Sequence, residues 1–231
     1  MTTTHFVRPA GPLLSGALLA ALLSLLPATD AVAARVTALN GLVQILRGER
    51  LFNAVVGSRL RLGDQFVTEG AESEALVRFD DGARLALRAD SRLEVTALKL
   101  RGAAESRQKT LNIIKGGLRY ISGRRTLKST VAFQTPTATI GIRGTDIEIA
   151  VSEDPVNNDP AGTYLKVNSG IANMAATDGT QVDVDAGQIA FGGLPEVVPR
   201  GPGGTRRPAA RKVEAAVGGL FKTGAMDRLL K

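Results

Sequence analysis

The sequence has no cysteine and no tryptophan among its 231 residues, and its single histidine is His5. Without cysteine the chain has no disulfide, no thiolate nucleophile and no thiolate ligand for zinc. Histidine is the side chain that enzymes use most often as a general base, and none follows His5. We therefore expect a protein that is not an enzyme, with no catalytic residues, no cofactor and no metal.

Residues 1–34 have the layout of a secretory signal peptide. Arg8 precedes an apolar run from Leu13 to Leu26, and the small residues Ala31, Val32 and Ala33 come shortly before Arg35. The apolar run is shorter than the ~20 residues that a membrane-spanning helix needs, although an uncleaved anchor is the alternative to cleavage. We predict cleavage near Ala33 or Ala34 and export to the periplasm or the cell surface, which suits a protein without disulfides.

Residues 35–194 are predicted to form one all-β domain. Short alternating apolar runs fill this region, Gly and Asp-Gly separate them, and no apolar stripe with a helical period is long enough to matter. Turn signals at such short intervals are typical of antiparallel sandwiches and rolls. The expected fold is an antiparallel sandwich, jelly-roll-like or solenoid-like.

The stretch from Thr135 to Val151 changes its alternation halfway along. Apolar residues share one parity up to Ile142 and the opposite parity from Ile147. Because side chains alternate between the faces of a strand, both runs are buried only if the chain bends or bulges between them. Gly144 lies at the switch and can adopt a positive φ, so we predict two core strands joined at a tight corner. A glycine followed by alternating residues recurs at Gly41, Gly117 and Gly170.

Two hairpins can be assigned down to their loops. A three-residue loop at residues 80–82 pairs Phe79 with Ala83 and keeps the apolar residues of both strands on one face, whereas a two-residue loop would split them. A loop at residues 177–179 does the same for the second hairpin. Such loops need a glycine in the left-handed conformation, and Gly82 and Gly179 occupy that position.

Residues 195–231 have a different composition from the β domain. They are rich in Pro, Gly and Arg, and their eight basic and three acidic residues give them +5 of the chain's net +7. We predict a flexible linker and a basic tail, with at most a short helix near Ala209 to Val217. A basic tail of this kind can bind anionic membrane or polymer.

Three groups of acidic residues were considered as sites, and each has a structural interpretation. Asp80 and Asp81 are adjacent in a turn and point in different directions, so the turn itself explains them. Asp183 and Asp185 share the outer face of a hairpin but have no third ligand. One loop could surround a calcium ion with oxygen atoms, but it lacks the spacing of a calcium-binding loop. Its polar residues are Glu153, Asp154, Asn157, Asn158 and Asp159.

Two further groups contain basic residues. Ser122 with Arg124, and Lys128 with Ser129, are the nearest approach to a serine and lysine pair, but closeness in sequence does not make a catalytic pair. Arg143, beside Gly144, is interpreted as an arginine that braces the predicted corner, because no glycine-rich phosphate loop or helix start accompanies it.

The order of several motifs resembles the FecR domain family. The most specific motif is T-P-T-A-T-I-G-I-R-G-T-D-I at Thr135 to Ile147, and the resemblance extends over nearly the whole of Val36 to Ala190. The other motifs are G-L-V-Q-I from Gly41, L-G-D-x-F-x-T from Leu62, F-D-D-G from Phe79, S-R-L-E-V from Ser91, K-G-G-L-R-Y from Lys115, V-N-S-G-I from Val167 and A-G-Q from Ala186.

The resemblance implies a β domain outside the cytoplasmic membrane that acts by contact with other proteins. In the best-known members it senses an outer-membrane iron-siderophore transporter and passes the signal to a cytoplasmic segment that controls a sigma factor. The residues before Leu13 are too few for such a segment, so we do not expect sigma-factor control by this chain alone.

Two hypotheses about function follow. The first is an exported, non-enzymatic module that binds a protein partner in the cell envelope, in envelope or iron-uptake-type signalling. The second is an envelope-tethering or structural protein that binds anionic polymer or membrane through its basic tail. Export argues against nucleic acid as a partner, and the sequence leaves the oligomeric state open. Salt distinguishes the two, because tail-driven binding should weaken steeply with ionic strength.

Overall fold

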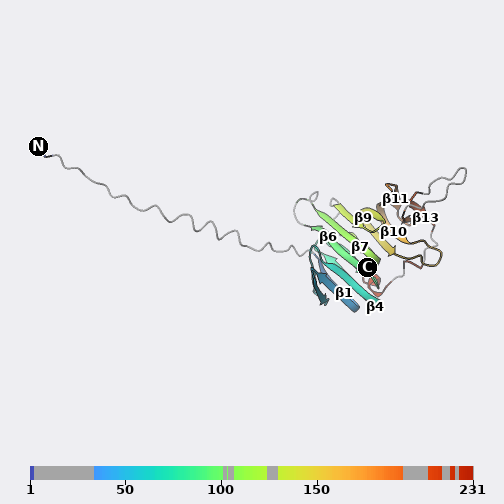
Figure 1. Cartoon of the computed structure of the whole chain (residues 1–231), viewed down its shortest axis with the longest axis horizontal. Coiled ribbons are helices and arrows are strands. Elements are labelled where there is room, and N and C mark those ends of the chain that lie inside the picture. The colour runs from blue at the N-terminus through green and yellow to red at the C-terminus, as the bar shows by residue number, and fades with distance from the viewer. Residues whose placement is uncertain are drawn as a thin grey trace. The chain divides into compact units, whose positions relative to one another are not determined.

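The computed structural model describes residues 1–2, 34–100, 103, 107–123, 130–194, 208–214, 219–221 and 224–230. Residues 31–231 form one compact unit (Figure 1). Residues 3–33 of the predicted signal peptide lie outside the described residues, and so does most of the predicted linker. None of the helices in the described ranges is both long enough and apolar enough to cross a bilayer.

The prediction of an all-β domain is confirmed, since strands account for almost all regular structure in the described residues. One short helix, α1 (Ala225–Arg228), lies near the C-terminus. The strands are β1 (Ala34–Arg47), β2 (Arg50–Asn53), β3 (Arg59–Leu60), β4 (Gln65–Phe79), β5 (Arg84–Leu87), β6 (Arg92–Lys99), β7 (Gln108–Ile121), β8 (Thr130–Gln134), β9 (Ala138–Ser152), β10 (Gly162–Ala176), β11 (Gln181–Asp185), β12 (Ile189–Gly192) and β13 (Ala210–Val213).

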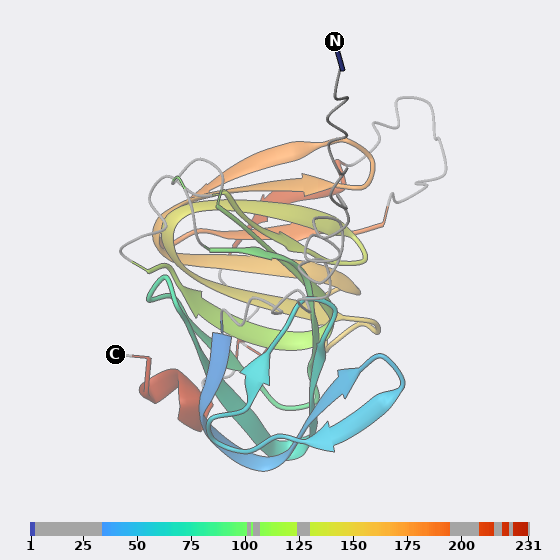
Figure 2. The ribbon, with the colours of Figure 1, turned by 90° about the vertical axis from the view of Figure 1, so that its left-hand side faces the viewer.

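The long strands β1, β4, β7, β9 and β10 each contribute to two packed layers, and Figure 2 shows how the long strands curve. In the first layer the neighbours run β13-β12-β10-β9-β7-β5-β4-β1-β3. In the second layer they run β2-β1-β4-β6-β7-β8-β9-β10-β11. One apolar core lies between the layers, because the buried residues of both layers form a single cluster.

Glycine bulges produce the change of layer. In the β9–β10 pair the register shifts on both sides of Ser169, where Gly144 has φ 61° and Gly170 has φ 83°. The predicted change of parity is therefore present, but the prediction of two separate strands is wrong: β9 is one strand with a bulge, because the ladder to β10 resumes on either side. Gly41 has φ 66° at the corresponding bend of β1. In β7 the positive φ belongs to Gly116, not to the predicted Gly117.

Both predicted hairpin loops are confirmed. The amide of Phe79 donates to the carbonyl of Ala83 at 2.9 Å, and Gly82 has φ 86°. In the second hairpin the amide of Ala176 donates to the carbonyl of Thr180 at 2.9 Å, and Gly179 has φ 83°. The paired apolar residues then share one face, as the alternation requires.

One strand pair departs from the expected antiparallel sandwich. β8 runs parallel to β7, with Gln108 opposite Thr130 and Asn112 opposite Gln134, whereas the other pairings of the described strands are antiparallel. Parallel neighbours cannot be joined by a tight hairpin, so the chain crosses over between Ile121 and Thr130. No turn signal in the sequence distinguished this crossover from a hairpin.

The predicted helix near Ala209 to Val217 is wrong over residues 210–213, which form β13. This strand pairs with β12, placing Ile189 opposite Val213 and Gly192 opposite Ala210. The preceding backbone is also held, because the amide of Ala209 donates to Asp178 Oδ2 at 3.1 Å. The free edge of β12 offers backbone partners that a helix could not use, and pairing therefore overrides the local helix propensity.

Candidate functional site

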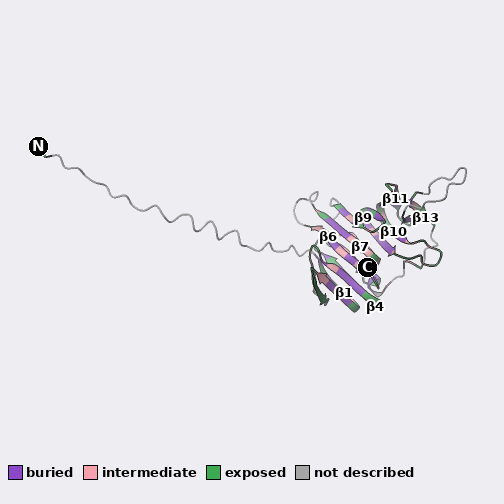
Figure 3. Cartoon of the chain, in the orientation of Figure 1, coloured by how far each residue is buried: buried purple, intermediate pink, exposed green. Residues whose placement is uncertain are grey.

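The edge strand β2 exposes a group of apolar side chains. Among the described strands β2 pairs with β1 alone, and Figure 3 colours the short strand on the side of β1 away from β4 as exposed. Leu51 and Phe52 of β2 are 56% and 44% exposed. Val55 and Val56, in the turn that follows, are 63% and 64% exposed, and Leu62 is 64% exposed. We call residues 50–56 the β2 edge. Apolar surface concentrated on a strand that has one free edge is typical of an interaction site.

The surroundings of the β2 edge are mainly basic. Arg50 is exposed, and Arg35 and Arg59 are exposed and opposite each other where β1 meets β3. Arg47 binds Asp64 through two contacts, Nε to Oδ1 at 2.7 Å and Nη2 to Oδ2 at 2.8 Å, so this carboxylate is already neutralised. The positive excess attracts acidic side chains of a partner.

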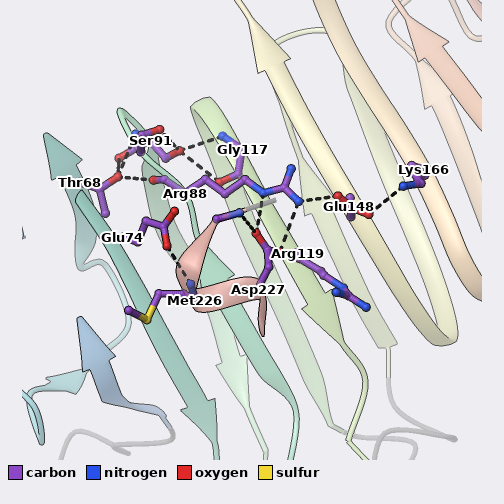
Figure 4. A network of polar contacts seen from close by, with 12 residues as sticks. Thr68, Glu74, Arg88, Ser91, Gly117, Arg119, Glu148, Lys166, Met226 and Asp227 are labelled. Atoms are coloured by element: carbon purple, nitrogen blue, oxygen red, sulfur yellow. Dashed lines mark hydrogen bonds and ion pairs between the residues drawn. The ribbon is translucent and has the colours of Figure 1, made fainter. Parts of the chain in front are cut away.

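A buried charge cluster lies on the outer face of the first layer (Figure 4). Its centre is Arg88, which follows β5 and is 8% exposed. Nη2 of Arg88 donates to Glu148 Oε2 of β9. Nε lies 3.2 Å from Asp227 Oδ2, and Nη2 lies 3.4 Å from Asp227 Oδ1. Asp227 belongs to α1 and is 2% exposed, so residues far apart in sequence share one buried arginine.

Glu148 is the best satisfied member of this cluster. Its Oε1 accepts hydrogen bonds from Lys166 Nζ and from Asn168 Nδ2, each at 3.1 Å. Burial by itself would raise the pKa of Glu148, but the hydrogen bonds from Arg88, Asn168 and Lys166 outweigh it and hold the pKa below its ordinary value. The carboxylate is therefore ionised at neutral pH and keeps Arg88 in place.

The C-terminal strap, residues 219–230 with 222 and 223 outside the described set, covers this face. At one end Leu220 and Phe221 pack against a cluster that includes Tyr164 and Phe191. At the other end Met226 and Leu230 pack on Leu76 and Ala86 of β4 and β5. The amide of Met226 also donates to Glu74 Oε2 at 2.8 Å, so both apolar and polar contacts hold the strap.

A cavity of about 520 Å³ lies between the sheet and the strap. The sheet contributes Glu72, Glu74, Arg88 and Gly117 to its lining, and the strap contributes Leu220 and Arg228. Nη1 of Arg88 is buried without a hydrogen-bond partner among the described residues, and Figure 4 shows it without a contact. A buried guanidinium nitrogen without an acceptor is costly, so the cavity is suited to a ligand that carries an acceptor oxygen.

A second buried charge pair lies inside the core and was not expected from the sequence. Nζ of Lys109, which is 1% exposed, lies 2.8 Å from Asp81 Oδ2 and 3.0 Å from the hydroxyl of Tyr120. It also lies 3.9 Å from the centre of the Phe79 ring, in a cation–π contact. Burial lowers the pKa of Lys109 to about 8, although Asp81 opposes the shift. Burial raises the pKa of Tyr120 well above its ordinary value.

These shifts predict a stability maximum at alkaline pH. Between pH 8 and the unfolded pKa of 10.5, the unfolded chain keeps the Lys109 proton that the folded chain has lost, so stability rises with pH. Above about pH 10 the unfolded tyrosines lose protons that folded Tyr120 keeps, and stability falls. We expect urea denaturation to show that the free energy of unfolding rises between pH 8 and pH 10. A Lys109→Met/Asp81→Asn variant should lose this gain; an unchanged profile in the variant would contradict the assignment.

The structure separates the acidic candidates from one another. Asp80 is exposed, whereas Asp81 is buried and forms an ion pair with Lys109. The two carboxylates therefore do not form a paired-carboxylate site. Asp183 and Asp185 are both exposed on β11, as predicted; Asp183 accepts a hydrogen bond from Asn173 at 2.8 Å. The loop acids lie in the polar turn between β9 and β10, where Val156 pairs with Asp159.

The basic candidates do not form a site in the described residues. Arg124, Lys128 and Ser129 lie outside the described residues. Ser122 accepts a hydrogen bond from the amide of Thr145 at 3.1 Å, which ties it to the bulge. Arg143 is exposed and has no hydrogen bond or ion pair to other described residues, so its predicted bracing role is wrong. The side chain that spans this region is Arg119, which binds Asp146 at 2.7 and 2.9 Å.

Comparison with known proteins gives a family match and several similar solved chains. Residues 64–173 match the model of the FecR family, described as FecR protein. No curated protein matches the chain. Two crystal structures of a candidate anti-sigma factor from Parabacteroides distasonis ATCC 8503, at 1.65 and 2.50 Å resolution, are 12% identical, with TM-scores of 0.42 and 0.43. The match covers 55% of this chain and 53% of each of those chains, so the chain spans about half of their length.

The matched region runs from Asp64, in the turn before β4, to Asn173 in β10. It therefore includes both glycine bulges of the β9–β10 pair and the buried residues Arg88, Lys109 and Glu148. The resemblance inferred from the motifs is confirmed over residues 64–173, which match the FecR family model.

Proposed function

We propose that the protein is an exported, non-enzymatic module that binds a protein partner in envelope signalling, and that the β2 edge makes the contact. The exposed apolar side chains on this edge strand and in the turn after it carry the proposal. The FecR match supports a regulatory role that depends on binding. Periplasmic or surface location belongs to this proposal and follows from the signal-peptide pattern of residues 1–34.

The β2 edge suits a partner that adds a strand. Phe52 lies opposite Ile45, which is 4% exposed and belongs to the core, so Phe52 lies at the margin of the apolar core. A strand added beside β2 would extend the core over Phe52 and supply backbone hydrogen bonds along the free edge. Because exposed arginines surround the edge, the partner strand should combine apolar with acidic side chains.

The alternative role, tethering through the basic tail, is less well supported. Two basic residues of the tail contact the β domain: the Arg211 guanidinium lies 4.6 Å from the centre of the Phe191 ring, and Lys212 Nζ lies 3.7 Å from Asp185. Charges held in this way are less available to an anionic surface. The β2 edge, in contrast, has unpaired backbone groups and exposed apolar side chains.

Substitution of the edge tests the proposal. We expect the Leu51→Lys/Phe52→Lys variant to capture its envelope partners at least tenfold less than the parent chain, because lysine on an edge strand opposes strand addition. Cross-linking in envelope extract with quantitative mass spectrometry measures this. Ile171→Lys is the matched control, since Ile171 is an exposed apolar strand residue (57%) on β10. The melting temperature of each variant checks that the fold is intact.

The same experiment identifies the alternative. Partner capture through the β2 edge should persist from low to moderate salt, whereas capture through the tail should fall steeply. If the edge variant keeps all partners while Arg206→Gln/Arg207→Gln loses them, the protein is an envelope tether and the proposal is wrong.

A further inference from the structure

The face beneath the C-terminal strap has the features of a peptide-binding groove. A buried charged centre, Arg88 with Glu148, lies between two apolar patches. One patch is Leu76 with Ala86, and the other includes Tyr164 and Phe191. Polar specificity at the centre and apolar pockets on both sides are the usual composition of a groove that recognises a short segment.

The strap shows which chemistry this groove accepts. Asp227 supplies a carboxylate to Arg88 (Figure 4). Met226 and Leu230 fill the patch formed by Leu76 and Ala86. Met226 and Leu230 are one helical turn apart, so they share a face of the strap. The occupant is therefore an acidic residue flanked by apolar residues in a single helical turn.

The strap does not satisfy the groove completely. Its carboxylate lies 3.2 and 3.4 Å from Arg88 nitrogens, longer than the 2.7–2.9 Å typical of charge-assisted hydrogen bonds. Nη1 of Arg88 has no acceptor among the described residues, and the cavity of about 520 Å³ beside the strap includes Arg88 in its lining. A segment with one more acceptor oxygen and more apolar volume would fit better than the strap does.

We propose that this groove is a second protein-binding site. Its ligand is a short segment of a partner protein that carries an acidic residue between apolar residues. The strap occupies the same site and competes with that segment. The site lies on the outer face of the first layer, on strands other than β2. It is thus separate from the β2 edge, and each site can be tested without the other.

A peptide with the sequence of residues 219–230 provides the probe, because it carries the groups that the groove binds. Tethering gives the strap a high local concentration, so the full chain should bind the labelled peptide weakly. A Met226→Ala/Asp227→Ala variant removes the carboxylate that the strap gives to Arg88 and one of its apolar side chains, and it changes no residue of the groove itself. Fluorescence anisotropy should show at least tenfold tighter binding to this variant than to the parent chain.

Two controls relate binding to Arg88. A peptide in which aspartate 227 is replaced by asparagine should bind the strap variant at least tenfold more weakly, and this test does not depend on how a protein variant folds. Adding Arg88→Met to the strap variant should also abolish binding of the peptide, and circular dichroism checks that this variant is folded.

Hydrogen exchange at the amide of Met226 should be slow in the parent chain, because this amide donates a hydrogen bond to Glu74.

Three outcomes would overturn the proposal. Equal affinity for the parent chain and the strap variant would show that the strap does not compete. Equal affinity for the aspartate and asparagine peptides would show that Arg88 does not bind the peptide carboxylate. A dimer in sedimentation analysis that requires Asp227 would assign the groove to the strap of a second copy and not to a different partner.

Discussion

Gly170→Val should destabilise the domain by more than about 3 kcal/mol, or prevent it from folding. Gly170 has φ 83°, and a Cβ added there would lie 2.7 Å from the Gly144 carbonyl oxygen and 2.8 Å from Thr145 Cγ2. A β-branched residue is strained at positive φ by about 1 to 3 kcal/mol, and the overlap with backbone adds to this strain. Thermal and urea denaturation would measure the loss.

Gly141→Ala is the matched control, since Gly141 lies in β9 on the same hairpin. A Cβ added there meets no atom within 4 Å, and its φ is not positive. Alanine should therefore leave stability unchanged or raise it slightly by restricting the unfolded chain. Equal melting temperatures for Gly170→Val and Gly141→Ala would mean that the bulge is not a rigid element of the fold.

Lys109→Met should destabilise the domain by about 3 to 5 kcal/mol, because it leaves the buried Asp81 carboxylate without its cation. The side chains of Lys109 and Asp81 are 1% and 3% exposed, so water cannot replace the lost partner. The Tyr120 hydroxyl also loses its 3.0 Å contact with Nζ. Urea denaturation at pH 7 would measure the effect.

The double variant Lys109→Met/Asp81→Asn should recover part of this loss. Asparagine is uncharged and still offers an oxygen to the amide of Ala83, which donates to Asp81 at 2.9 Å. Replacing both members of a buried ion pair is often far less costly than removing one of them. If the double variant were as unstable as the sum of the two single variants, the two side chains would not be coupled.

The buried charged side chains are held by ion pairs. Arg88, Lys109 and Asp81 are charged and buried, but each is engaged with an oppositely charged partner within the described residues. Ion pairs of this kind fix the register of strands and the position of the strap.

Some features of the domain could be predicted from the sequence because they depend on neighbours along the chain. The loop of Asp80, Asp81 and Gly82 follows from the alternation of the two adjoining strands and from the need for a left-handed glycine. The change of parity between Ile142 and Ile147 required a bend for the same reason. The all-β class and the FecR motifs have this local origin as well.

The tertiary structure alone decided which distant residues meet. Arg88 and Asp227 are 139 positions apart, and nothing in the alternation around Arg88 distinguished it from an exposed arginine. The local signal for the strap was a few apolar residues in a polar tail, namely Leu220, Phe221, Met226 and Leu230. Lys109 has the parity of the buried residues Leu111 and Ile113, so the alternation directs it inward, and its charge is compensated there by Asp81 and the ring of Phe79. The exposure of Leu51 and Phe52 also depends on β2 being the last strand of its layer, and strand order is set by packing of the whole sheet and not by local sequence.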